Sequence, residues 1–138
     1  RLEQLVSRVD HANFRILADL GNFADVDEDC ASAVGRLADW IRHVHIKDFH
    51  LKPGSEIYPG EGWSVSRGGN YLRGAIVGHG NVPVLNCIKA LQDKGYDGWL
   101  VVEFEGLEDP EQATVLSLIN IRRMLEAVQY FRWSGDDL

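Results

Sequence analysis

Three ionisable side chains lie within apolar, strand-like runs of this 138-residue chain. They are Asp19 in RILADLGN, His45 in RHVHIKD and Glu103 in WLVVEFEG. Burying an ionised carboxylate without a partner costs free energy, so a shared cation would explain all three positions. Two carboxylates and one imidazole suit Mn²⁺, Mg²⁺, Co²⁺ or Zn²⁺ better than a metal that prefers thiolates. The alternative is a buried hydrogen-bonded pair of histidine and carboxylate without a metal.

The runs that carry these residues are expected to be strands, at residues 13–22, 42–48 and 99–105. Helices are expected at residues 1–9, 33–42, 84–95 and 110–131, and residues 134–138 are expected to fray. Gly95 is placed to end one helix in a left-handed turn, and Asp109 precedes Pro110 as an N-cap. The alternation predicts an α/β fold with a parallel sheet. Three strands are too few to close a barrel, which needs about eight.

Alternation of side chains within each expected strand separates an apolar face from a mixed face. His43, His45 and Lys47 share one side of the second strand, opposite Val44 and Ile46. The mixed faces of the other two strands carry Arg15, Leu17 and Asp19, and Val101, Glu103 and Glu105. Such a pattern is typical of a barrel wall, with helices outside and ionisable groups toward the catalytic mouth. Leu17 and Val101 would then be exposed in an isolated slice of the barrel.

Residues 49–81 form a stretch with eight glycines and no sustained period. A connection this long is usually functional or disordered, so it is either a loop that covers a substrate or a passive insertion. Trp63, Arg67 and Arg73 are available there to stack on a polar ligand or to donate hydrogen bonds to it.

Composition narrows the classes of function. The net charge of -7 argues against a surface that binds nucleic acid. No apolar run is long enough to span a membrane, and no leader pattern points to export, so a cytoplasmic location is expected. Cys30 and Cys87 have no CxxC spacing and are expected to be reduced core thiols.

Four segments in combination resemble one known family. HVHIKDF, GHGNVP, KGYDGW and LVVEFEGLED look like the C-terminal part of the xylose-isomerase-like sugar isomerase/epimerase superfamily. The resemblance implies that residues 1–138 are the C-terminal part of one TIM-barrel domain and contain its last three strands. It also implies that Asp19, His45 and Glu103 are the metal ligands on those strands. The family's fourth ligand, a glutamate on the preceding strand, would lie upstream of Arg1.

The same resemblance implies a metal-dependent isomerase or epimerase that acts through an enediolate on a ketose or a polyol-type substrate. Glu103 would be a ligand and an acid/base group together. Lys47 and Glu105 would bind substrate hydroxyls or balance charge, although a salt bridge between them is an equal alternative. Asn22 stands where several epimerases place a substrate-contacting histidine.

His79, between two glycines of the GHGNVP segment, is either a substrate contact or an exposed turn residue. Arg73 is a further expected substrate contact.

Other functions of this chain stay open. A lyase of the inosose-dehydratase type would use the same metal and base to expel water. The endonuclease IV branch carries an additional Asp-x-His pair, and Leu72 and Gly74 stand at those positions, which argues against phosphodiester cleavage. The chain could also be an inactive fragment, a half-barrel that needs its missing N-terminal half, or a homo-oligomer.

Overall fold

A three-stranded parallel sheet forms the centre of the computed structural model, which describes residues 1–133 and side-chain surroundings as far as residue 129. Its strands are β1 (Ile16–Asp19), β2 (Ile41–Ile46) and β6 (Trp99–Val102), in the order β1-β2-β6. Both pairs of neighbours run parallel, with Asp19 opposite His45 and His45 opposite Val101. The predicted α/β fold with a parallel sheet is confirmed.

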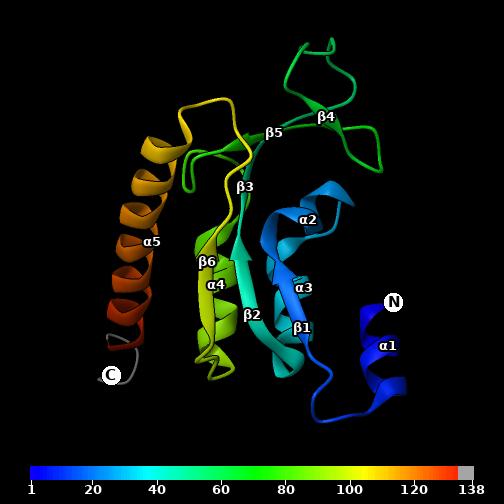
Figure 1. Cartoon of the computed structure of the whole chain (residues 1–138), viewed down its shortest axis with the longest axis vertical. Coiled ribbons are helices and arrows are strands. Elements are labelled where there is room, and N and C mark those ends of the chain that lie inside the picture. The colour runs from blue at the N-terminus through cyan, green and yellow to red at the C-terminus, as the bar shows by residue number, and fades with distance from the viewer. Residues whose placement is uncertain (134–138) are drawn as a thin grey trace.

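Helices α3 (Cys30–Leu37) and α4 (Val84–Asp93) lie between successive strands of this sheet and cover one of its faces. The 3-10 turn η1 (Ala38–Trp40) leads into β2, α1 (Leu2–Val9) precedes β1, and α5 (Pro110–Trp133) follows β6. In Figure 1, α3 and α4 lie behind the sheet, and α5 runs beside β6. The cap Asp109 accepts a hydrogen bond from the Gln112 amide at 2.9 Å, and Gly95 has a φ of 71°, so both predicted helix ends are confirmed.

The hydrophobic core lies between the sheet and its covering helices. Val44 and Ile46 of β2 are fully buried there, together with Val34 of α3 and Cys87 of α4. On the opposite face, the side chains of Leu17 and Val101 are 52% and 37% exposed. The predicted separation of the two faces is therefore confirmed, because the apolar face packs on helices and the mixed face is open in the described part of the chain.

Several predicted boundaries were wrong. The expected strand 42–48 is β2 (Ile41–Ile46), and the end of the expected helix 33–42 belongs to η1 and to β2. The expected strand 13–22 is shorter, because Asp19 caps a helix, α2 (Leu20–Asp25), that follows it directly. The expected helix 33–42 begins earlier, at Cys30, because Asp29 accepts a hydrogen bond from the Ser32 amide at 2.7 Å. The expected strand 99–105 ends at Val102, where its pairing with Ile46 of β2 ends.

The stretch 49–81 contains regular structure, which corrects the expectation of an irregular loop. It builds a second, antiparallel sheet from β3 (Asp48–Lys52), β4 (Ser64–Val65) and β5 (Tyr71–Ala75), in the order β3-β5-β4. Figure 1 shows this sheet beyond the end of β2 at which the chain leaves the strand. It lies therefore at the same end of the parallel sheet as the ionisable residues.

Three further expectations concern the cysteines, a membrane-spanning segment and the C-terminal residues. Cys30 and Cys87 are free and buried, as predicted. Within the described residues, no helix combines the length and the apolar character that a membrane crossing requires. The predicted fraying of residues 134–138 falls outside the described residues.

Candidate metal centre

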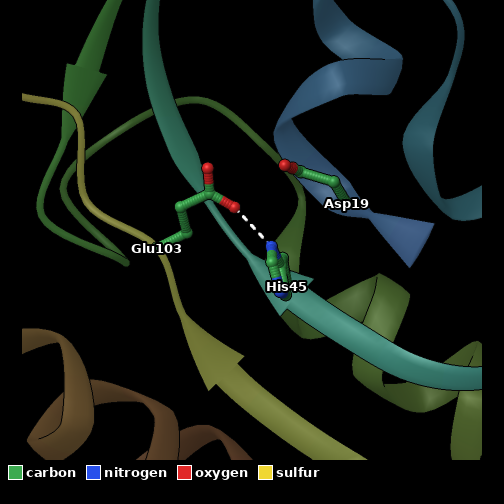
Figure 2. Close-up of side chains that lie close together, drawn as sticks. All are labelled: Asp19, His45 and Glu103. Atoms are coloured by element: carbon green, nitrogen blue, oxygen red, sulfur yellow. Dashed lines mark hydrogen bonds and ion pairs between the residues drawn. The ribbon is translucent and has the colours of Figure 1, made fainter. Parts of the chain in front are cut away.

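Asp19, His45 and Glu103 meet because their strands are in register. Asp19 pairs with His45 across β1 and β2, and Glu103 follows β6, where its amide still donates to the Ile46 carbonyl at 3.1 Å. One ligand atom from each of the three residues lies within 4.8 Å of those of the other two. Figure 2 shows the carboxylates of Asp19 and Glu103 above the ring of His45, on opposite sides of it.

The carboxylate of Asp19 is fixed by the helix that begins next to it. Its Oδ1 atom accepts hydrogen bonds from the amides of Gly21 at 3.0 Å and Asn22 at 3.3 Å. These are free amides of the first turn of α2, which a side-chain acceptor stabilises. The other oxygen, Oδ2, is left for the site.

Glu103 and His45 are in direct contact. Nδ1 of His45 lies 2.5 Å from Oε2 of Glu103 (Figure 2), within hydrogen-bond distance. Metal ligands must be deprotonated, so a cation bound by these two atoms would replace this hydrogen bond. The ring of His43 stands edge-on to that of His45, with the centroids 5.3 Å apart.

Lys47 supplies the positive charge of the site. Its ammonium group lies 3.1 Å from Oδ2 of Asp19, 2.8 Å from Oε1 of Glu103 and 3.2 Å from Oε2 of Glu105. The side chain is only 5% exposed. The salt bridge predicted as one role for Lys47 and Glu105 is therefore present, and it includes both carboxylate ligands as well.

These contacts shift the pKa values of the group in different directions. The hydrogen bond from Lys47 holds the pKa of Glu103 below its usual value, against the effect of desolvation. Burial lowers the pKa of Lys47, but its bonds to Glu103 and Asp19 outweigh burial and raise it. For Asp19, burial raises the pKa, and the hydrogen bond and charge of Lys47 act in the opposite direction.

The three side chains fit a divalent cation. They offer two carboxylates and one imidazole from three adjacent strands, and carboxylate and imidazole ligands suit Mg²⁺, Mn²⁺, Co²⁺ and Zn²⁺. Two ligand atoms about 2.2 Å from a common ion lie at most about 4.4 Å apart, so atoms that lie within 4.8 Å of one another need only small side-chain adjustments to share an ion. The predicted ligand set is thus brought together, while metal binding itself stays a prediction.

The ligands line one end of a cavity with a volume of about 520 Å³. Asn22 lines the same cavity, as do Leu17 and Phe23. A cavity of this size accommodates a small polar molecule. Asn22 is therefore in place for its predicted contact with a substrate, and Glu105 is held near the site through Lys47.

Two predicted substrate contacts lie elsewhere. Arg73 of β5 lies 5.6 Å from the ring centroid of Trp63, and its Nη2 atom is 3.8 Å from Glu108. His79 lines a separate cavity with Asn120 and Met124 of α5. The structure does not bring either side chain into contact with the three ligands, and their binding roles stay predictions.

Asp48 is a residue of the site region that sequence reasoning missed. Its buried carboxylate accepts hydrogen bonds from the amides of Phe49, Gly78, Gly80 and Val82, at 2.8–3.0 Å. A Cβ atom at Gly80 would lie 2.2 Å from Oδ1 of Asp48, so the turn requires glycine there. The sequence contains one signal for this contact, because the segment HIKD supplies Asp48 and the segment GHGNVP supplies the amides that bind it.

Comparison with known proteins identifies the family of this chain. A family profile described as "xylose isomerase-like TIM barrel" matches residues 1–124. An inosose dehydratase from Bacillus licheniformis is 32% identical over 124 residues, which cover 88% of this chain and 40% of that protein. An inosose dehydratase from Lacticaseibacillus casei is 29% identical over 112 residues, which cover 81% and 37%. This chain thus spans about two fifths of the length of these curated relatives.

Solved structures agree on the fold. A xylose isomerase domain protein from Planctomyces limnophilus superposes with a TM-score of 0.69 at 24% identity, over 93% of this chain and 42% of that one. A D-tagatose 3-epimerase-like protein gives a TM-score of 0.63 at 24% identity, over the same shares. With its three parallel strands and their helices, the chain belongs to the xylose isomerase-like TIM barrel family.

Proposed function

We propose that Asp19, His45 and Glu103 hold one divalent metal ion in an enzyme that removes a carbon-bound proton next to the carbonyl of a sugar or cyclitol. The observation that carries this proposal is the convergence of three ligand atoms within 4.8 Å at matching strand ends. When bound, the ion would polarise the carbonyl and stabilise the enediolate that follows proton loss. Membership of a family of sugar-processing enzymes supports this chemistry.

Glu103 is the proposed base. The hydrogen bond from Lys47 holds the pKa of Glu103 below its usual value and so favours the ionised carboxylate, which is the form that can accept a proton. Its Oε1 atom is fixed 2.8 Å from the ammonium of Lys47, which orients the group and balances the charge that moves during the reaction. Asn22, whose side chain lines the same cavity, would contact a substrate hydroxyl.

Dehydration is the proposed outcome of the reaction. After proton removal, the hydroxyl on the carbon next to the enediolate leaves as water, with a proton supplied by an acid. The similarity to proteins named inosose dehydratase, at 27–32% identity, favours this outcome. Epimerisation, in which the proton returns to the other face of the same carbon, is the second candidate, and the motifs of the sequence support it.

The whole enzyme would need the upstream strands of the barrel. We propose residues 1–138 as the C-terminal part of one TIM-barrel domain, with a fourth ligand on the strand before Arg1. Activity of the chain by itself is expected to be negligible, because one acid/base group and half of the cavity wall would be missing. A cytoplasmic location and a homo-oligomeric state stay predictions.

Hydrogen exchange at carbon tests the proposed reaction. A protein that contains this chain and the upstream strands is incubated in D₂O with an inosose or a free ketose, with and without Mn²⁺. NMR should show deuterium next to the carbonyl only when Mn²⁺ is present, and mass spectrometry should show loss of water from the inosose.

The variant Glu103→Gln should slow exchange at least about 100-fold, the usual contribution of a positioned acid/base group. Glu56→Gln is the control, because Glu56 is exposed and pairs with the exposed Lys52. Exchange that is unchanged in Glu103→Gln, or that continues after chelation of the metal, would overturn the proposal. Return of deuterium with inverted configuration and no loss of water would favour the epimerase.

A further inference from the structure

The residues around Lys47 leave space for its side chain. Its aliphatic stem passes directly over the backbone of Gly21, where a Cβ atom would lie 2.7 Å from Cγ and 2.9 Å from Cβ of Lys47. Glycine at this point of α2 therefore leaves the space that the lysine stem needs. The ammonium group then reaches three carboxylates, while almost no part of the side chain contacts solvent.

The two oxygens of Glu103 have different partners. Oε2 is 2.5 Å from His45, in the proposed metal centre, and Oε1 is 2.8 Å from the ammonium of Lys47. Figure 2 shows one oxygen directed at His45 and the other turned away from it. A carboxylate that offers one oxygen to each of two cations is how bridging ligands act in two-metal sites, in which the ions lie about 3.5–4 Å apart. In this site, the second cation beside Glu103 is the ammonium group of Lys47.

The charges agree with this arrangement. Asp19, Glu103 and Glu105 contribute three negative charges around Lys47, and its ammonium balances one of them. One divalent ion balances the remaining two. A second divalent ion beside Lys47 would leave two uncompensated positive charges among these groups, and removal of the lysine charge would leave only one.

We propose that Lys47 is a built-in counter-cation that limits this carboxylate cluster to a single divalent ion. The inference rests on the proposed metal centre and adds to it a residue that determines the number of ions bound. Lys47 is a positioning residue in this role, because it acts on the ligands Asp19 and Glu103 and not on the reacting atoms.

Metal stoichiometry tests the inference without any measurement of activity. The protein with its upstream strands is titrated with Mn²⁺, and bound ions are counted by calorimetry and by electron paramagnetic resonance. The wild type should bind one ion per chain at this cluster, even in excess Mn²⁺. Lys47→Met, which keeps the length of the side chain and removes its charge, should bind a second ion and give the spectrum of a spin-coupled pair.

Three further variants make the result specific. Lys47→Arg keeps the positive charge and should bind one ion. Lys52→Met removes an exposed lysine of β3 and should also bind one. In the Lys47→Met background, Glu105→Gln removes a carboxylate that is not a proposed ligand of the first ion, and should weaken the second ion about tenfold or more.

The outcomes separate the two proposals. A wild type that binds no Mn²⁺ would contradict the metal centre itself. A wild type that binds a coupled pair, or a folded Lys47→Met variant that still binds one ion, would overturn the role of Lys47 and leave the metal centre standing. Should Lys47→Met not fold by circular dichroism, the wild type in excess Mn²⁺ decides, because two coupled ions would overturn the role and one supports it.

Discussion

At the scale of single residues, the partners of a buried carboxylate indicate what it can do. Asp48 has four backbone amides as partners, which no ligand can replace without breaking the turn that they form. Glu103 has an imidazole and an ammonium group as partners, and the residue lines an open cavity. Such a carboxylate can bind a metal ion without loss of a backbone contact, whereas Asp48 cannot. We therefore assign chemistry to Glu103 and a structural role to Asp48.

The three proposed ligands could be predicted because strand parity is a local property of the sequence. Asp19, His45 and Glu103 each end an apolar run on the mixed face of that run. The salt bridge of Lys47 with Glu105 was one of the predicted alternatives, but its contacts with Asp19 and Glu103 were not predicted, because only the fold brings these residues together. The separation of Arg73 and His79 from the three ligands could not be predicted either, because it depends on how the second sheet folds.

Thiol reactivity is the first prediction and belongs to this scale. Burial raises the pKa of Cys30 to about 11 and that of Cys87 to about 12. A raised pKa keeps each thiol protonated at about pH 8, and the thiolate is the reactive form. Neither cysteine should react with a disulfide reagent in the native protein, and both should react in denaturant. Rapid labelling of the folded protein would contradict the buried positions in α3 and α4.

At the scale of elements, the helices depend on signals in the nearby sequence, whereas the second sheet depends on contacts between residues that are far apart in the sequence. Helices α4 and α5 could be predicted from Pro83 and Gly95 at the two ends of α4 and from Asp109 and Pro110 at the start of α5. The sheet β3-β5-β4 could not, because its glycine-rich sequence has no period. It depends on distant contacts, such as those of the Asp27 carboxylate with Ser66 and Asn70 at 2.8 and 2.7 Å. The short helix α2 was missed because LGNFAD continues an apolar run.

Substitution of two helical glycines by alanine gives the second prediction. Gly35→Ala in α3 should raise the free energy of unfolding by about 0.5–1 kcal/mol, because alanine favours helix and no atom lies within 4 Å of the new Cβ. Gly21→Ala in α2 should lower it by about 1–3 kcal/mol, because the Cβ would collide with Lys47 and with Phe49. Denaturant unfolding of both variants measures the difference. Equal effects would contradict the close packing of Lys47 on α2.

The third prediction concerns the contact that joins β3 to the turn 78–82. Asp48→Asn should lower the free energy of unfolding by about 3 kcal/mol, because an amide group replaces one acceptor oxygen and leaves buried N–H groups without a partner. Hydrogen exchange of the Gly78, Gly80 and Val82 amides should become faster. Asp93→Asn, at the exposed end of α4, is the matched control and should change stability little. Unchanged exchange in Asp48→Asn would contradict the role of Asp48.

At the scale of the whole molecule, the parallel sheet resembles one side of a barrel wall. Its helical face is packed, while Leu17 and Val101 are exposed on the face that would be the inside of a closed barrel. The edges β1 and β6 have no further partner strand in the described part of the chain. Upstream strands of the kind that the family has would cover this face and pair with an edge. Sequence parity predicted the open face, since it depends only on alternation within each strand.

The location of a bound metal is the most direct test of the account. Crystals of a protein that contains this chain and its upstream strands are soaked in Mn²⁺, and the anomalous scattering of manganese is mapped. We expect one peak between Asp19, His45 and Glu103, about 2.0–2.2 Å from a ligand atom of each. A fully soaked crystal without a peak there, or with manganese bound only elsewhere on the acidic surface, would contradict the central claim.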